Sequence, residues 1–385
     1  MTRFALLSLL LLTAPTAHSA RLRAGAAKVD ITRDSARTGD PLYAKALVLT
    51  DGDKTAVLVA IDAVAIGEIG SIRNDFLGNV RARLQTELGI EPANVLMNAS
   101  HCHGVVSLKI EELTFQAIAA AAKNMVPVKA GVGTGSEDRV MENRRIVLKS
   151  GRQVDVRQAY SLPPDEEMAA VGPVDTEIGI LRLDRLDGTP LALVYNFACH
   201  PIKGIPSGGN TADMSGFASQ VIEDNLGHGA VALFVQGCGG DINPIEYKQV
   251  DLPRDAEPFG NLLGLSTLTA ARQIKTVADA GLNMVNHTLA VPRADHTKRI
   301  AEMDAEQLKL LKSLRGTSLN LKTFLPLYSK YQLTGEFPSE HAYRYLRDEQ
   351  IGRDNLKKLD TRNEADLARY IRNIHTMEEL TRLMI

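Results

Sequence analysis

The sequence predicts an α/β protein with a mixed, largely parallel sheet that is flanked by helices and followed by a helical C-terminal extension. Two patterns lead to this prediction. Short apolar runs rich in β-branched residues alternate with stretches in which apolar residues recur at helical spacing, as in α/β domains. From about residue 298 onward, charged residues of both signs are interleaved on a helical repeat, which predicts amphipathic helices.

The expected strands are short and bounded by turn residues. The segment Asp51-Gly52-Asp53 separates two apolar runs and therefore predicts a β-hairpin. The expected helices have apolar residues three and four positions apart, and the first of them stops at Gly89. The predicted strands are residues 46–49, 55–61, 95–97, 178–183, 191–197 and 231–235. The predicted helices are residues 72–88, 108–124, 217–226 and 258–280, followed by one or two helices within residues 344–384.

Composition limits the classes of function that this chain can have. A chain of 385 residues that is 44% hydrophobic can bury a large core, either as one large α/β domain or as two smaller ones. Its formal net charge of −2 provides no field of one sign that would attract nucleic acid or an anionic membrane. The absence of tryptophan and an aromatic content of 5% argue against a base-stacking surface. Nucleic acid is therefore not an expected partner.

The first twenty residues have the pattern of a secretory signal peptide, which predicts an exported protein, periplasmic or secreted. Arg3 supplies a positive start, Phe4 to Leu12 form a short apolar run, and Ala14 to Ala20 provide a cleavage region of small residues. The run is shorter than the ~20 residues that a membrane-spanning helix needs; an uncleaved anchor is the alternative. The predicted parts are a signal peptide at residues 1–20, an α/β domain at residues 21–297, and a charged helical extension of the same domain at residues 298–385.

Three polar clusters each follow a predicted strand. They are residues 98–104, 199–201 and 237–244. Ligand sites of open α/β sheets form at the carboxyl ends of strands, so we expect the three clusters to contribute to one site. Each cluster contains one cysteine, and an odd number of cysteines leaves at least one unpaired. The sequence leaves the pairing open among Cys102, Cys199 and Cys238.

His101 and His103 are candidate metal ligands. In extended chain, residues two positions apart point to the same side, so both imidazoles can face one point. His200, from the second cluster, can add a third imidazole. Zinc favours imidazole nitrogen, and catalytic zinc sites usually combine three protein ligands with an open position. The alternative is that His101 and His103 form a surface loop and that His200 is an ordinary core histidine.

Other polar residues near the clusters have two interpretations each. The glycines among residues 237–240 either present backbone N–H groups to an anion or allow a tight turn. Asp62 and Asp213 either orient metal-bound histidines or serve as turn and helix-cap residues. The chain has no Gly-x-Ser-x-Gly elbow and no nucleotide-binding glycine loop, so these common patterns of hydrolases and nucleotide-binding proteins do not apply.

Taken in order, the motifs between about Arg23 and Tyr247 resemble those of the neutral (alkaline, non-lysosomal) ceramidases and their bacterial relatives. The resemblance implies a zinc hydrolase of sphingolipid metabolism that cleaves an N-acyl amide, in the type case ceramide, by a metal-activated water. A lipid-like amide substrate follows from it, and contact with a membrane surface is expected only through that substrate. The segments that carry the resemblance are residues 24–32, 98–104, 142–145, 196–201, 213–219 and 240–244.

The resemblance also implies roles for individual residues. His101 and His200 would be the zinc ligands that this part of the chain supplies. His103 would lie beside the metal water and act as a proton donor or hydrogen-bond partner. Arg144 would bind the substrate or polarise its carbonyl group. These roles fit zinc hydrolysis, in which a nearby histidine can protonate the leaving nitrogen.

Two departures from the family pattern change what we expect. Asn243 stands where the family has the serine of its Gly-Asp-x-Ser-Pro motif, which excludes a serine nucleophile there and makes Asn243 a candidate hydrogen-bond donor to the oxyanion. No segment matches the later glutamate and tyrosine zinc ligands of the family or its immunoglobulin-like domain, so we expect a truncated chain. Two alternative functions follow: a catalytically silent binding protein with an incomplete metal site, and a zinc esterase or peptidase on the same scaffold.

Overall fold

The computed structural model describes most of the chain beyond the predicted signal peptide, which lies outside the described residues. Contacts between Cα atoms divide the chain into two compact units, Met1–Asn286 and His287–Ile385. The candidate site residues all belong to the first unit. The described residues are 22–34, 40–151, 153–155, 165–204, 210–245, 254–313 and 355–384.

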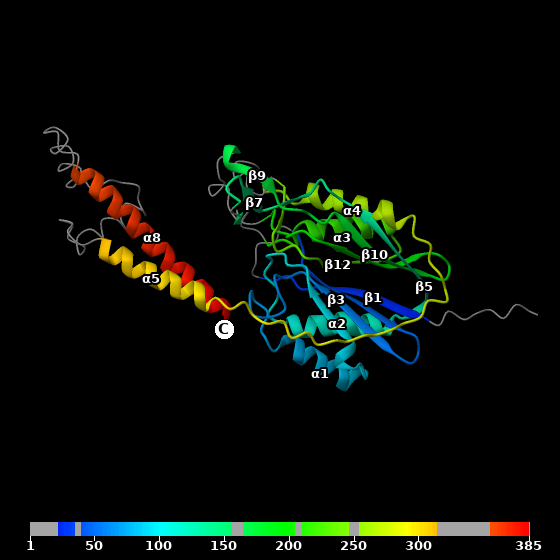
Figure 1. Ribbon diagram of the computed structural model, residues 1–385. Coiled ribbons are helices and arrows are strands. Elements are labelled where there is room, and N and C mark those ends of the chain that lie inside the picture. The colour runs from blue at the N-terminus through cyan, green and yellow to red at the C-terminus, as the bar shows by residue number, and fades with distance from the viewer. Residues whose placement is uncertain are drawn as a thin grey trace, which may run out of the picture. The chain divides into compact units, whose positions relative to one another are not determined.

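The first unit is built on an eight-stranded sheet with helices on its outer faces, which confirms the predicted mixed α/β fold (Figure 1). All six strands expected from the sequence are present in this sheet, and two further strands complete it. In spatial order the strands are β12 (Val231–Gln236), β11 (Pro190–Phe197), β10 (Glu177–Arg185), β5 (Val126–Ser136), β1 (Arg23–Asp30), β2 (Tyr43–Thr50), β3 (Thr55–Ile61) and β4 (Val95–Ala99).

Parallel pairing is less extensive in this sheet than we expected, and this part of the prediction is corrected. It occurs at the two ends of the described sheet, between β11 and β12 and between β3 and β4. The pairs between these ends are antiparallel. Short connections explain the difference, because β2–β3 and β10–β11 are joined by tight turns, and a parallel pair needs a crossover of a dozen or more residues.

The eight-stranded sheet folds over on itself at β5. Val126 and Pro127 pair with β1, whereas the strand from Val128 onward pairs with β10. The half that contains β12 then packs across β2, β3 and β4, so that two sheet layers face each other. The buried side chains between the layers are Leu22, Ala24, Leu47, Ala60, Val128, Leu183, Leu191, Ala192, Val194, Val231 and Leu233.

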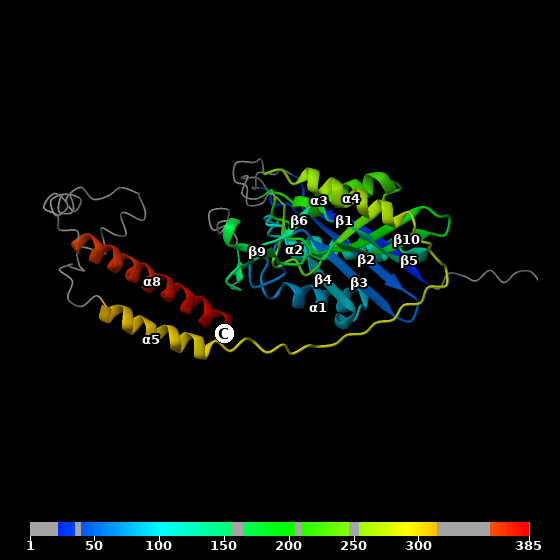
Figure 2. The same ribbon diagram turned by 45° about the horizontal axis from the view of Figure 1, so that its top comes forward.

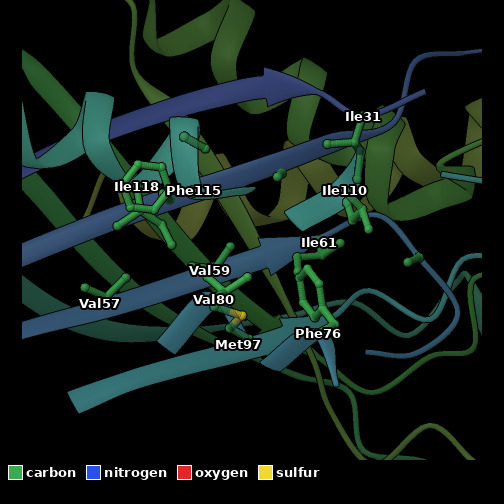
Figure 3. Close-up of a cluster of buried hydrophobic side chains, with 14 of the residues drawn as sticks. Ile31, Val57, Val59, Ile61, Phe76, Val80, Met97, Ile110, Phe115 and Ile118 are labelled. Atoms are coloured by element: carbon green, nitrogen blue, oxygen red, sulfur yellow. The ribbon is translucent and has the colours of Figure 1, made fainter. Parts of the chain in front are cut away.

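Helices cover the outer face of each sheet layer. On one layer, α1 (Phe76–Leu88) and α2 (Ile110–Lys123) bury a cluster that includes Phe76, Phe115 and Ile118 against β2, β3 and β4 (Figure 3). On the other layer, α3 (Asp213–Leu226) and α4 (Glu257–Ala271) pack against β10, β11 and β12. Figure 2 shows α3 and α4 at the top of this four-layer arrangement.

Three of the helices differ from their predicted boundaries by several residues at one end each. Helix α1 begins four residues later than expected, α3 begins at Asp213 rather than residue 217, and α4 ends at Ala271 rather than residue 280. The predicted stop at Gly89 is confirmed, since this residue has the left-handed φ of 64° that glycine accepts without strain. A 3₁₀ turn, Pro92–Asn94, leads into β4.

Strands β1 and β5 were not predicted. The sequence of β5 contains Gly131, Gly133 and Gly135, and glycine weakens a strand pattern in single-sequence reasoning. The structure gives one reason for them: a Cβ atom on Gly131 would lie 2.4 Å from the Lys275 carbonyl oxygen. The chain after α4 therefore runs against β5 at a distance that only glycine allows.

Two small sheets lie beside the main sheet and were also not predicted. Strand β6 (Met141–Asn143) pairs with β13 (Ile242–Pro244). Strand β7 (Arg145–Leu148) lies between β8 (Gln153–Asp155) and β9 (Met168–Val171), and a 3₁₀ turn, Asp165–Glu167, precedes β9. The pairing of β6 with β13 brings segments about one hundred residues apart in the chain next to each other.

The second unit contains a pair of amphipathic helices, α5 (Thr297–Ser313) and α8 (Asn355–Met384), which lie side by side in both ribbon views (Figures 1 and 2). Gln307 Nε2 donates to the Tyr370 carbonyl (3.0 Å), and Glu306 forms an ion pair with Arg369. The helical structure predicted within residues 344–384 is thus confirmed for Asn355–Met384, and residues 344–354 lie outside the described range. Nowhere in the described chain is a helix both long and apolar enough to cross a bilayer.

Candidate metal centre

The loop that follows β4 holds His101 in a defined position. The Ser100 N–H donates to the Ile61 carbonyl (2.9 Å), and the His101 N–H donates to the Ala63 carbonyl (2.9 Å). These bonds to the end of β3 fix His101 in the left-handed region, at φ 65°, which non-glycine residues rarely adopt. The backbone therefore turns sharply at His101.

The loop that follows β11 supplies His200. Its N–H donates to the carbonyl of Ile242 in β13 (2.9 Å), which ties the second polar cluster to the third. The ring centroids of His101 and His200 are 4.4 Å apart, and that of His103 lies 5.6 Å from the first and 5.7 Å from the second. One ring nitrogen from each histidine lies within 4.8 Å of the other two. The three predicted histidines thus converge.

The ring nitrogens of this group have the lone pairs that a metal ion needs. His101 Nδ1 lies 2.6 Å from the Val64 carbonyl oxygen, which can only accept, so Nδ1 carries the proton and Nε2 has the lone pair. His103 Nε2 and His200 Nδ1 are buried and have no hydrogen-bond partner. Orphaned buried nitrogens are costly unless a ligand satisfies them. The three side chains therefore fit a metal ion such as zinc.

The electrostatics of the group keep two of the imidazoles neutral. Burial, the neighbouring His101 and His103, and the Arg144 guanidinium together lower the pKa of His200 to about 4, although a hydrogen bond to the Gly239 backbone acts in the opposite direction. Burial and the neighbouring His101 also lower the pKa of His103. Neutral imidazole is the form that binds metal ions.

Arg144 directly follows β6 and its charge acts on His200, and Asn243 lies in the partner strand β13, next to the Ile242 carbonyl that accepts from the His200 N–H. The Arg144 N–H donates to the Asp241 carbonyl (2.8 Å), and its Nε lies 2.9 Å from Asp155 Oδ1 in an ion pair. Asn243 is opposite Glu142 in the β6–β13 ladder and only 1% exposed, and its Oδ1 is buried without a hydrogen-bond partner. The five predicted site residues thus come from neighbouring loops and strand β13, while their chemical roles stay predictions.

The arrangement of these elements is similar to that of two solved ceramidases. The neutral ceramidase from Pseudomonas aeruginosa superimposes with a TM-score of 0.52 at 20% identity, over 66% of this chain and 45% of that one. A ceramidase complexed with C2 gives a TM-score of 0.51 at 19% identity, over 66% and 44%. The fold is ceramidase-like. No protein-family model matches the chain, which spans less than half the length of either ceramidase.

In this ceramidase-like fold, the carboxylates of Asp62 and Asp213 accept hydrogen bonds from backbone N–H groups rather than from imidazoles. Asp62 Oδ2 accepts from the Tyr43 N–H (2.9 Å), and its carboxyl group also bonds the Ser100 side chain beside His101. Asp213 accepts from the N–H groups of Lys203, Gly204 and Met214 at 2.6–3.2 Å. Each carboxylate thereby fixes a loop that carries a histidine. Of the two interpretations drawn from the sequence, this agrees with the one in which Asp62 and Asp213 stabilise turns.

Burial raises the pKa of both carboxyls, to about 6 for Asp62, where it outweighs the nearby Lys45 charge, and to about 6 for Asp213, where it outweighs the backbone hydrogen bonds. A group with a raised folded-state pKa contributes stability below its unfolded pKa of 3.8, and this contribution is lost as the pH rises through about 6. For Asp62, a shift of this size corresponds to about 3 kcal/mol. The charged form of each group therefore destabilises the fold near neutral pH.

We expect the variant Asp62→Asn to gain stability relative to the unmodified chain as the pH rises from 4 to 7. Asparagine keeps an acceptor for Tyr43 N–H but carries no buried charge. Urea unfolding at several pH values measures the difference between the two chains, which cancels the titration of the histidines because both chains contain them. A difference that is constant across this pH range would contradict the raised pKa.

Gly237 and Gly239 of the third cluster allow close packing. A Cβ on Gly239 would lie 2.6 Å from Gln236 Nε2 and 3.0 Å from the Cys199 carbonyl carbon, so the loop after β12 touches the loop that carries His200. All three cysteines are free: Cys102 and Cys199 are buried, and Cys238 is exposed. Burial raises the pKa of the Cys102 and Cys199 thiols, so neither is a reactive thiolate.

Two polar residues that support the site were missed from sequence. The side-chain amide of Asn210 makes two hydrogen bonds with the backbone of Val105. The Val105 N–H donates to Asn210 Oδ1 (2.5 Å), and Asn210 Nδ2 donates to the Val105 carbonyl (2.9 Å). Asp40 accepts from the Ala212 N–H (2.8 Å). Both residues lie in loops, and nothing in their local sequence indicates partners more than one hundred residues away. Only the tertiary fold reveals them.

Proposed function

We propose that this chain is a zinc-dependent hydrolase of an N-acyl amide, with a ceramide-like lipid as substrate. The observation that carries the proposal is the convergence of three imidazoles, of which His103 and His200 each have one buried ring nitrogen without a protein partner. A ceramidase-like fold supports the class of substrate, because the two similar solved proteins are named ceramidases. The ordered motifs of the sequence support the same substrate class.

In this proposal His101 and His200 hold the ion, each from the end of a different strand. A bound zinc ion supplies a water that ionises near neutral pH and a Lewis acid for the carbonyl group. The Val64 carbonyl fixes the His101 tautomer and ring orientation through the Nδ1 hydrogen bond (2.6 Å), as outer partners of metal-bound histidines commonly do. Imidazole ligands suit zinc, copper, iron and nickel, and we choose zinc among them because the motifs resemble those of zinc hydrolases.

Arg144 and Asn243 would act on the substrate. Arg144 keeps its guanidinium near His200 through the ion pair with Asp155, in a position to donate to the amide oxygen as negative charge develops. Asn243 is held rigidly in β13, and one end of its amide lacks a partner. Rotation of the Asn243 side-chain amide by about 180° exchanges the positions of Oδ1 and Nδ2. Nδ2 can then donate a second hydrogen bond to the oxyanion from the position that Oδ1 occupies now.

The test of the function is hydrolysis of matched substrates by the purified chain. A short-chain fluorescent ceramide in detergent and its ester analogue are assayed after chelation and after zinc is restored. We expect amide hydrolysis that disappears with the chelator and returns with zinc. Cleavage of the ester alone would favour a zinc esterase, and zinc binding without hydrolysis of either substrate would overturn the enzymatic proposal in favour of a binding protein.

Arg144→Gln is expected to lower kcat by about 10²–10³-fold, because a donor to the developing oxyanion contributes most in the transition state. The neighbouring Arg145 provides a matched control, since its guanidinium pairs with Asp241 (3.0 Å) and is 55% exposed. We expect Arg145→Gln to keep kcat within a few-fold. Equal losses in both variants would mean that the effect is structural and not one of substrate binding by Arg144.

A further inference from the structure

We propose that His103 is the third metal ligand of this chain, in place of the proton-donor role that its motif implies. The inference rests on the proposed metal-dependent function and assigns a role within that same site. The question is which side chain completes the coordination of the metal ion. Among the described residues, the group that could hold an ion consists of three histidines and contains no carboxylate or thiol.

The position of His103 fits a ligand. Its ring centroid is almost equally far from those of His101 and His200, at 5.6 and 5.7 Å, so its ring completes a triangle with the other two. Two nitrogens bound to one tetrahedral zinc ion at 2.0–2.1 Å lie about 3.4 Å apart. No pair of these ligand nitrogens is more than 4.8 Å apart, so each separation is within about 1.4 Å of this value, a difference that small side-chain rotations can close.

The surroundings of His103 leave its ring without another task. Its Nε2 is buried and has no hydrogen-bond partner among the protein groups. The carboxylates that sequence reasoning placed near the site, Asp62 and Asp213, are occupied by backbone N–H groups and the Ser100 side chain. A metal ion at the centre of the three rings satisfies the orphaned nitrogens of His103 and His200 together.

The loop that carries His103 is fixed on both sides, as a ligand requires. Before it, the N–H groups of Ser100 and His101 bond the end of β3. After it, a Cβ on Gly104 would lie 2.7 Å from the Leu42 side chain, and Val105 makes two hydrogen bonds with Asn210. The backbone at His103 is therefore held in place before any ion binds, which reduces the entropy cost of coordination.

The experiment measures metal binding directly and does not depend on turnover. The metal-free full chain and the variants His101→Ala, His103→Ala and His200→Ala are titrated with Zn²⁺ against a chromophoric chelator, with the exposed His228→Ala as the control. Since even outer partners of metal ligands change affinity by about 10–100-fold, we expect each of the three variants to lose at least about 100-fold. Circular dichroism of the metal-free forms checks that the variants are folded.

Co²⁺ substitution decides between a ligand and a hydrogen-bond partner, because the visible spectrum of Co²⁺ depends on its coordination. We expect His103→Ala to change that spectrum and added imidazole to restore it. An unchanged Co²⁺ spectrum in His103→Ala would overturn the inference while leaving the proposed function intact. A wild-type chain that binds neither ion would instead refute the proposed metal-dependent function, and the ligand role with it.

Discussion

Replacement of His200 by alanine is expected to lower hydrolysis of the amide substrate by at least about 10⁴-fold. His101 and His103 share one loop after β4, whereas His200 alone comes from the end of β11, so its loss leaves two imidazoles from one side of the site. Bound zinc would lower the pKa of a water to about 7, and the described residues of the site would not provide this without the ion. Turnover and metal content, measured on the same sample, check both parts of the prediction.

The same variant has a predicted effect on stability that needs no substrate. Zinc at a hundred times its dissociation constant is expected to stabilise the wild-type chain by about 2.7 kcal/mol, because the ion binds the native state. In His200→Ala at the same zinc concentration, the melting temperature should not respond to zinc. His228→Ala, whose side chain is exposed and outside the group, should respond as the wild type does. A full zinc response in His200→Ala would place the metal elsewhere.

The candidate site was predictable because its signals are local. Each polar cluster directly follows an apolar run, and the structure ends β4 at Ala99, β11 at Phe197 and β12 at Gln236, within two residues of the clusters. An apolar run bounded by glycine and polar residues needs no distant partner to be recognised as a strand. The convergence of His101 with His200 was an inference from strand ends and is confirmed by geometry.

The direction of the strands and the doubling of the sheet were not predictable in this way. Both depend on which strands pair, and pairing is decided by contacts between residues far apart in the sequence. Strand β5 illustrates this, because Val126 and Pro127 pair with one half of the sheet and the residues after them with the other. Nothing in the local pattern marks Val128 as the point where the partner changes.

Lys45 illustrates the same limit within a predicted strand. The strand was expected to begin at Ala46, one residue after this lysine, and lysine is rarely buried. In the structure Lys45 lies inside β2, between the two sheet layers, and is 5% exposed. Its partner Glu223, in α3, is 178 residues further along the chain. A buried charge of this kind can be placed only when its partner is known.

Replacement of Glu223 by glutamine is expected to destabilise the fold by about 3–5 kcal/mol, because it leaves a buried lysine charge without its partner. Lys45 Nζ lies 3.0 Å from Glu223 Oε1, and the two side chains are 6% and 10% exposed. Glu223 also bonds Lys28 Nζ (2.5 Å) and the Ala232 N–H (3.0 Å). Urea unfolding at pH 7 measures the loss. The exposed pair Arg73–Asp75 is the control, where Asp75→Ala should cost about 1 kcal/mol or less.

The double variant Lys45→Met, Glu223→Gln separates an unpaired charge from lost packing. Methionine fills the space of the lysine stem without a charge, and glutamine still accepts from the Ala232 N–H, so the double variant should recover most of the stability that Glu223→Gln loses. If the free energy of unfolding of the double variant fell by the sum of the losses in the two single variants, the charge argument would be contradicted.

The pH dependence of the Glu223→Gln effect follows from the same ion pair. Burial alone would raise the pKa of Glu223, but Lys45, Lys28 and the Ala232 N–H outweigh it and lower that pKa. A lowered folded-state pKa contributes stability that is present above the unfolded value of 4.5 and is lost as the pH falls through the folded value. The difference in unfolding free energy between wild type and Glu223→Gln should therefore shrink below about pH 4.5. This trend is opposite to that of Asp62→Asn. It distinguishes a carboxylate whose hydrogen-bonded lysines outweigh its burial from one whose burial outweighs the nearby Lys45 charge.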